Sequence, residues 1–261
     1  MEVPAPHGGR PAPNGRRPRG VAAFDVDGTL TRGGSVARFV VAVVGWRRLL
    51  RGALRHLPSV LLGPVVGGRA ADRAKERLFE ATLGGTPLAD AKAAARRFAE
   101  AHLARRGRPD VLVRLAAHRQ AGHLVVLVSA SPTLYVARLG ELLQADGVVA
   151  TELAVDQAGR LTGRLAGANC RGAEKACRLA AWLAAHGAEG AELWAYGNSA
   201  GDRELLARAD HPVHVGRLGR LGRLRRFPRL AVAPLPQAPV IGSSSGAVDG
   251  APDHVVEPGR R

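Results

Sequence analysis

The sequence predicts an α/β protein: a Rossmann-like parallel sheet with helices on both faces and a helical cap inserted after the first strand. Short apolar runs typical of buried strands alternate along the chain with longer stretches typical of helices. Polar residues follow several of these runs, at the strand ends where sheets of this class bind ligands. Residues 33–108, between the first two runs, contain no convincing strand. We therefore expect this segment to form a helical insertion over one end of the sheet.

The composition is that of a globular chain with excess positive charge. Of its 261 residues, 46% are apolar and 23% charged, which excludes a wholly disordered protein. The formal charge of +16 is weak evidence for nucleic-acid binding, because an Arg-, Ala- and Gly-rich composition can reflect coding bias. Cys170 and Cys177 offer neither a disulfide framework nor zinc-site spacing. Since residues 1–20 also lack a signal-peptide pattern and no apolar run is long enough to span a membrane, we expect a cytoplasmic protein.

The sequence separates into tails, core and cap. Residues 1–20 and 231–261 are rich in Pro and Gly with little to bury, so both are expected to be disordered tails. Residues 21–32 and 109–230 form the predicted α/β core. Residues 33–108 form the predicted helical cap.

Periodicity and capping residues place the individual elements. A buried strand is predicted over 21–25, and helices over 35–62 and 70–83. Thr86 is expected to be the N-cap, and Pro87 the first position, of a helix that reaches about residue 106. Further along, the predictions are helices over 109–120, 132–143, 172–186 and 200–208, strands over 123–129, 192–196 and 213–215, and extended chain over 148–155 followed by a hairpin around Gly159 over 156–164.

The first predicted strand ends in Asp25-Val26-Asp27-Gly28-Thr29. Gly28 turns the chain there and is expected to leave backbone amides exposed. Paired carboxylates at a strand end can hold Mg²⁺, and one can act as nucleophile while the other acts as acid and base. The alternative is a polar turn after a strand, with no chemistry.

The second strand ends in Ser129-Ala130-Ser131-Pro132, directly before a helix. Hydroxyls and free amides at a helix N-terminus favour an anion, above all phosphate. For Ser131 we expect N-capping, with Pro132 opening the helix, whereas Ser129 lies further back and is the candidate ligand. Lys175 lies in the first turns of a later helix, where the helix dipole disfavours a cation. It is expected either to face an anion or to be a solvated surface lysine.

A third polar cluster, Gly197-Asn198-Ser199-Ala200-Gly201-Asp202, follows the strand over 192–196. Asn198 and Asp202 carry oxygen donors that suit Mg²⁺. The alternative is an Asx turn with Asp202 in the first helical turn.

Together and in this order, the paired carboxylates, the hydroxyl, the lysine and the Asn/Asp loop resemble the motifs of the haloacid dehalogenase (HAD) superfamily of phosphotransferases, over roughly residues 21–215. The cap placement and Val-Ser-Ala-Ser-Pro are most similar to subfamily IB, the phosphoserine-phosphatase-like group. The resemblance implies a Mg²⁺-dependent phosphomonoester hydrolase in which Asp25 becomes an aspartyl-phosphate, while Asp27 protonates the leaving oxygen and then activates water. Ser129 and Lys175 would be catalytic as well, by holding the phosphoryl oxygens. The implied sites are phosphate binding by Gly28, Thr29, Ser129, Ala130 and Lys175, and Mg²⁺ binding by Asp25, Asp27, Asn198 and Asp202.

Asn198 departs from the commonest pattern of the family, which has Asp at this place. An amide oxygen still binds Mg²⁺ but brings no charge, so we expect weaker metal affinity. A non-catalytic phosphate-binding protein with the same fold is therefore the alternative function.

The expected substrate is a small phosphorylated molecule. No acidic residue lies between Gly28 and Ala71, while seven arginines do: Arg32, Arg38, Arg47, Arg48, Arg51, Arg55 and Arg69. We expect this segment to pack its apolar side on the core with solvated arginines; the alternative is contact with an anionic membrane surface, for which the basic stretch from Arg217 to Arg229 is a second candidate. Nucleic acid is not expected as a partner, because aromatic residues are only 4% and no zinc-finger or helix-turn-helix pattern is present, although a basic nucleic-acid-binding protein is a further alternative.

Overall fold

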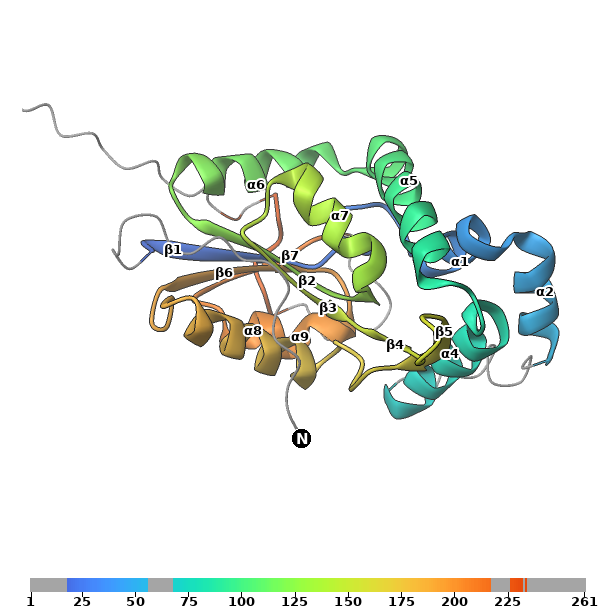
Figure 1. Cartoon of the computed structure of the whole chain (residues 1–261). Helices are drawn as coiled ribbons and strands as arrows, with labels where there is room; N and C mark the ends of the chain where they lie inside the picture. Colours follow the sequence, from blue (N-terminus) through green and yellow to red (C-terminus); the bar gives the residue numbers. More distant parts are fainter. Residues whose placement is uncertain (1–17, 56–67, 217–225, 232, 234–261) are drawn as a thin grey trace, which may run out of the picture.

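The computed structural model describes residues 18–55, 68–216, 226–231 and 233 (Figure 1). The predicted tails, 1–20 and 231–261, lie almost entirely outside these residues. So do residues 56–62 of the helix predicted over 35–62, and most of the basic stretch from Arg217 to Arg229.

The described chain folds around a five-stranded parallel sheet with the strand order β3-β2-β1-β6-β7 (Figure 1). The predicted strands are found within a few residues of their expected bounds. The strands are β1 (Gly20–Phe24), β2 (Leu124–Pro132), β3 (Gly147–Thr151), β6 (Glu192–Gly197) and β7 (His211–His214).

Both faces of the sheet are covered by helices, because the strands are apolar on both sides. Ala22 and Phe24 of β1 pack into one core with α6 (Pro109–Gln120) and α7 (Thr133–Leu143). The intervening Val21 and Ala23 pack into a second core with α8 (Ala173–Ala185) and α9 (Arg203–Arg208). The predicted α/β fold class is confirmed.

Helices from the segment between β1 and α6 gather at one end of the sheet (Figure 1). They are α1 (Val36–Val44), α2 (Trp46–Arg55), α4 (Gly68–Leu83) and α5 (Leu88–Arg106). An antiparallel hairpin of β4 (Leu153–Val155) and β5 (Leu161–Leu165) joins them, because β5 packs against α4. Its predicted turn is present: Gly159 has a φ of +70°, and Oδ1 of Asp156 accepts hydrogen bonds from the amides of Ala158 and Arg160.

Two predictions about the helices of this end are wrong. The helix expected over 35–62 breaks at Gly45, whose φ of +79° and ψ of +160° end α1 before α2 begins. Thr86 does not cap α5, because Pro87, with a ψ of +133°, takes the N-cap position and the helix starts one residue later. The hydroxyl of Thr86 is instead buried without a hydrogen-bond partner in the described structure.

Three further boundaries differ from the prediction. The extended run over 148–155 is two strands, because the chain leaves the sheet at Glu152 and pairs with β5. The helix over 200–208 begins as the 3-10 turn η2 (Ala200–Asp202). β2 continues through Pro132, so that Pro132 is the N-cap of α7 and Ser131 is not.

Candidate active site

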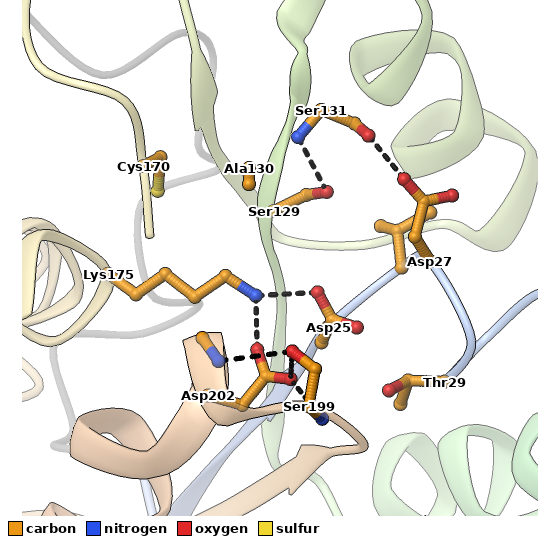
Figure 2. A network of polar contacts seen from close by, with 12 residues as sticks. Asp25, Asp27, Thr29, Ser129, Ala130, Ser131, Cys170, Lys175, Ser199 and Asp202 are labelled. Carbon is orange, nitrogen blue, oxygen red and sulfur yellow. Dashed lines mark hydrogen bonds and ion pairs between the residues drawn. The ribbon is translucent and has the colours of Figure 1, made fainter. Parts of the chain in front are cut away.

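The carboxyl ends of β2, β1 and β6 meet at one edge of the sheet, because these parallel strands are neighbours. Asp25 directly follows β1, Ser129 belongs to the last part of β2, and Asp202 lies in the loop after β6. Lys175 joins them from the first turn of α8. Figure 2 shows Lys175, Asp25 and Asp202 turned toward one another, whereas Ser129 and Asp27 contact Ser131.

Lys175 is the central cation of this edge. Its Nζ donates to Oδ1 of Asp25 and to Oδ1 of Asp202, each at 2.5 Å (Figure 2). Because the side chain is only 2% exposed, Lys175 is not a solvated surface lysine. Burial alone would lower the pKa of Lys175, but the charges of Asp202 and Asp25 outweigh burial and hold it above its ordinary value. The lysine is therefore a fixed positive charge.

Asp25 is a buried carboxylate with an unusual pKa. The pKa of Asp25 is raised to about 7. Burial is the main cause and the charge of Asp202 adds to it, while Lys175 opposes both effects. Lys175 bonds to Oδ1, so Oδ2 of Asp25 is outside this ion pair. A carboxylate that is costly to ionise and aligned by one cation is typical of a functional group.

Asp202 is held by both of its oxygens. Oδ1 pairs with Lys175, while Oδ2 accepts from the amide and hydroxyl of Ser199 at 2.9 and 2.8 Å and from the amide of Asn198 at 3.2 Å. Burial opposes ionisation, but Lys175 outweighs burial and lowers the pKa of Asp202. Gly197 leaves room for this arrangement, because a Cβ there would lie 2.5 Å from the Cβ of Asp202. The loop thus fixes the lysine through Asp202.

The turn after β1 contacts the side chain of Asn198, and the backbone amides of Gly28 and Thr29 in this turn are not free to bind a ligand. The amide of Gly28 donates to the carbonyl of Thr31 at 2.8 Å, and the amide of Thr29 to that of Val26 at 3.3 Å. The expectation of exposed amides is wrong for Gly28 and Thr29, because the turn pairs these two amides internally. Gly28 has a φ of +84°, and a Cβ on it would lie 2.0 Å from Nδ2 of Asn198. The Thr29 hydroxyl donates to Oδ1 of Asn198 at 3.4 Å.

Ser131 was predicted to cap a helix but instead contacts a site carboxylate. Its hydroxyl donates to Oδ2 of Asp27 at 2.5 Å (Figure 2). Its amide donates at 3.1 Å to Oγ of Ser129, which is 1% exposed. The physical reason is that β2 stays extended through Pro132, and the spacing of two between the serines was the sequence signal for a shared side of a longer strand.

Lys75, on α4, is a further polar residue at this edge that the sequence did not single out. Its Nζ donates to the carbonyl of Ala130 at 2.5 Å and to Oδ1 of Asn169 at 2.7 Å. Asn169 in turn donates to Oδ1 of Asp72, also on α4, at 2.6 Å. Burial lowers the pKa of Lys75 to about 8, and the charge of Asp72 opposes this. These contacts fasten α4 to the last part of β2 and to the loop between β5 and α8.

The donors at this edge fit a hard divalent cation. Within the described residues no three His, Cys, Asp or Glu side chains are grouped to hold a metal, so a ligand set here has to include other oxygens. The amide oxygen of Asn198 is of this kind, and the carboxylate of Asp25 can join it. Oδ1 of Asp27 is buried without a hydrogen-bond partner in the described structure, and two further aspartates, Asp25 and Asp202, share one buried lysine. This excess negative charge favours a cation, above all when a phosphate is added.

A family model matches most of the chain. The family is described as haloacid dehalogenase-like hydrolase, and the match covers residues 22–207. Protein CicA of Caulobacter vibrioides (strain NA1000 / CB15N) is 36% identical over 193 residues, which are 73% of this chain and 83% of CicA. The CicA of a second strain, ATCC 19089 / CIP 103742 / CB 15, matches equally.

Solved structures share the fold at low sequence identity. A protein of unknown function from Bordetella pertussis Tohama I has a TM-score of 0.69 and 24% identity, covering 81% of this chain and 98% of that one. A phosphoserine phosphatase, solved as a phospho-aspartyl intermediate analogue, has a TM-score of 0.56 and 17% identity, covering 76% of this chain and 87% of that one. The predicted similarity to the phosphoserine-phosphatase fold is confirmed.

Proposed function

The chain belongs to the haloacid dehalogenase-like hydrolases, and we propose that it is a Mg²⁺-dependent phosphomonoester hydrolase that acts through an aspartyl-phosphate. The observation that carries this proposal is the buried ion pair of Asp25 with Lys175 at the edge where strand ends meet. It supplies an aligned carboxylate oxygen and, beside it, a fixed cation for the oxygens of a phosphoryl group. The proposed substrate is a small phosphorylated molecule in a cytoplasmic setting, and residues 33–108 are proposed as the cap over this site.

In the first step, Oδ2 of Asp25 attacks phosphorus and forms a P–O bond. The bond between phosphorus and the leaving oxygen breaks, and the leaving oxygen keeps the electron pair. Asp27 supplies the proton that this oxygen takes up, so that the product departs as a neutral alcohol. Asp25 then carries the phosphoryl group, and Asp27 is ionised.

In the second step, Asp27 takes a proton from water as the water oxygen attacks phosphorus. The bond between phosphorus and Asp25 breaks, inorganic phosphate leaves, and both aspartates return to their starting states. Lys175 and the hydroxyl of Ser129 hold the phosphoryl oxygens in both steps.

Not every predicted site residue keeps its expected part in this proposal. The backbone of Ala130 stays a proposed phosphate neighbour. The internally bonded turn of Gly28 and Thr29 supports a part in holding Asn198. Since both oxygens of Asp202 already accept protein hydrogen bonds, we propose that it orients Lys175 instead of binding metal.

The residues proposed to hold Mg²⁺ are Asp25 through its carboxylate, Asp27 through its backbone carbonyl and Asn198 through its amide oxygen. A bound Mg²⁺ would supply positive charge to the phosphate and to the carboxylates around it. The alternative of a non-catalytic phosphate-binding protein predicts binding without turnover.

The test of this function is phosphate release from 4-nitrophenyl phosphate, with Mg²⁺ and with EDTA. We expect turnover only with Mg²⁺, and a loss of at least about a thousandfold in Asp25→Asn. Asp156→Asn is the matched control, because Asp156 sits in the hairpin turn and its remaining oxygen can still accept the two amide hydrogen bonds. Wild-type protein that binds phosphate but releases none from any phosphomonoester would favour the non-catalytic alternative.

We also propose that the outer side of α2 contacts anionic membranes. Trp46, Leu50 and Leu54 recur every four residues, share one side of the helix and are 62%, 49% and 59% exposed. The exposed Arg47 and Arg51 lie beside them. This pattern is typical of helices at lipid interfaces. Pairing of two copies through this side would bring like charges together, so an anionic lipid surface is the better fit.

Vesicle co-sedimentation tests this contact without relying on activity. We expect binding to phosphatidylglycerol vesicles and not to phosphatidylcholine vesicles, and a loss of binding in the triple variant Trp46→Ala, Leu50→Ala, Leu54→Ala. Val113→Ala on α6 is the control, because Val113 is equally exposed, at 61%. Equal sedimentation of the triple variant and the control would overturn the proposal. Within the described residues, no helix is long and apolar enough to cross a membrane.

A further inference from the structure

The two oxygens of Asp27 have different surroundings. Oδ2 accepts the hydrogen bond from Ser131, whereas Oδ1 is buried and makes no hydrogen bond in the described structure. An unpaired buried carboxylate oxygen is costly, so its persistence calls for a reason. In the proposed reaction, one oxygen of Asp27 has to exchange a proton with substrate and water.

Ser131 belongs to a buried chain of hydroxyls. Oγ of Ser131 lies 3.5 Å from Oγ of Ser35, and Oγ of Ser35 is in a short hydrogen bond with Oη of Tyr135. All three side chains are at most 1% exposed. They come from β2, from the residue before α1 and from α7, so three separate parts of the fold meet behind Asp27.

The number of protons available fixes the donor and the acceptor of each hydrogen bond in this chain of hydroxyls. A carboxylate oxygen without a proton can only accept, so the single proton of Ser131 is committed to Asp27. Ser131 can therefore only accept from the hydroxyls behind it. Burial raises the pKa of Tyr135 well above its ordinary value, so Tyr135 keeps its proton and acts as the terminal donor. Every proton of the chain then points toward Oδ2 of Asp27.

We propose that Ser131, Ser35 and Tyr135 are positioning residues that keep Oδ2 of Asp27 as an acceptor and reserve Oδ1 for proton transfer. This inference rests on the proposed phosphatase function. A proton placed on Oδ2 would face the hydroxyl proton of Ser131, so a protonated Asp27 carries its proton on Oδ1. That proton goes to the leaving oxygen in the first step, and Oδ1 receives a proton from water in the second.

A variant of Ser35 can distinguish a positioning role of the hydroxyl chain from a purely structural role. It occupies the N-cap position of α1, where a serine hydroxyl commonly binds a free amide, yet it makes no side-chain cap hydrogen bond. Its hydroxyl is turned to Tyr135 and Ser131 instead. Removing this hydroxyl therefore costs α1 no cap interaction, which makes Ser35→Ala a clean probe of the chain.

The readout is the dependence of kcat/KM on the leaving group, because kcat/KM covers the steps up to departure of the leaving oxygen and excludes hydrolysis of the intermediate. An alkyl phosphate needs its leaving oxygen protonated, whereas 4-nitrophenyl phosphate has a good leaving group and needs less help. We expect Ser131→Ala, Ser35→Ala and Tyr135→Phe each to lose about tenfold more kcat/KM on an alkyl phosphate than on 4-nitrophenyl phosphate. Ser131→Thr, which keeps the hydroxyl, should retain the wild-type ratio.

Thr133→Val is the matched control, because Thr133 is a buried hydroxyl at the start of α7 that bonds to Thr151 and Glu152, outside the chain. Equal losses on both substrates in the folded variants would overturn the proposal and leave the phosphatase function standing. An inactive wild type would instead refute the function itself. If Ser131→Ala does not fold, Ser35→Ala and Tyr135→Phe decide the question by the same ratio.

Discussion

Asp25 and Asp27 are two residues apart, yet they lie in opposite electrostatic surroundings. Asp25 is paired with a buried lysine that it shares with Asp202, so its neighbours are full charges. Asp27 is bound by Ser131, and behind it lie the neutral hydroxyls of Ser35 and Tyr135. A full charge fixes the orientation of the carboxylate that it pairs with, whereas neutral hydroxyls orient a carboxylate without compensating its charge. The contrast supports different tasks for the two aspartates.

Disrupting the ion pairs around Asp25 should lower the free energy of unfolding more than disrupting the hydroxyls around Asp27. Lys175→Met removes the cation and leaves Asp25 and Asp202 buried without compensation. We expect the free energy of unfolding to fall by about 3 kcal/mol, and phosphate release to be lost. Urea denaturation measures the first effect, with Lys92→Met on the exposed side of α5 as the control. A loss of stability no larger than in the control would mean that the ion pairs do not hold this edge.

The ionised carboxylate of Asp25 should destabilise the folded state at high pH. Because the folded-state pKa is raised from 3.8 to about 7, this carboxyl stabilises the folded state fully below pH 4, and the contribution is lost as pH rises through 7. Asp25→Asn removes that penalty, so at pH 8 in EDTA we expect it to be about 2 kcal/mol more stable than wild type. Near pH 4 the gain should vanish, which is an internal control. A variant less stable than wild type at pH 8 would contradict the raised pKa.

Asn198 tests the metal assignment. Replacing its neutral amide with a carboxylate adds a negative charge beside the proposed Mg²⁺ without changing the length of the side chain. We expect Asn198→Asp to lower the Mg²⁺ concentration for half-maximal rate by about tenfold. A Mg²⁺ titration of phosphate release measures this. An active variant with an unchanged requirement would remove residue 198 from the ligand set.

Removing a hydroxyl from the chain behind Asp27 should have the smallest effect on the free energy of unfolding. Tyr135→Phe removes one hydroxyl from the chain and leaves the ring in place, so we expect the free energy of unfolding to fall by about 1 kcal/mol. Urea denaturation measures it beside Lys175→Met. A loss as large as that of the lysine variant would show that the hydroxyl chain is a main support of the fold, and would erase the energetic difference between the two surroundings.

The sequence predicted the charged half of the site far better than the neutral half. Asp25 and Asp202 follow the neighbouring strands β1 and β6, so the strand order brings them together, and Lys175 joins them from the first turn of α8. The contact of Ser131 with Asp27 depends on how far β2 stays extended, and periodicity does not fix strand ends to one residue. The same limit produced the error at Thr86.

Contacts between segments that are distant in the sequence could not be predicted from the sequence pattern for another reason. Ser35 and Tyr135 are a hundred residues apart, and Lys75 on α4 reaches the carbonyl of Ala130 on β2. Such pairs follow from packing in three dimensions, which local spacing does not encode. The break at Gly45 was readable in principle, because glycine is the residue that accepts a positive φ.

The central claim is that Asp25 carries the phosphoryl group. The direct measurement is mass spectrometry of protein that has been quenched in acid during turnover of a phosphorylated substrate and digested. The account predicts one added phosphoryl group on the peptide that contains Asp25, removed by hydroxylamine as an acyl phosphate is, and absent in Asp25→Asn. A hydroxylamine-resistant phosphoryl group on Ser129, or steady phosphate release with no modified peptide, would contradict it.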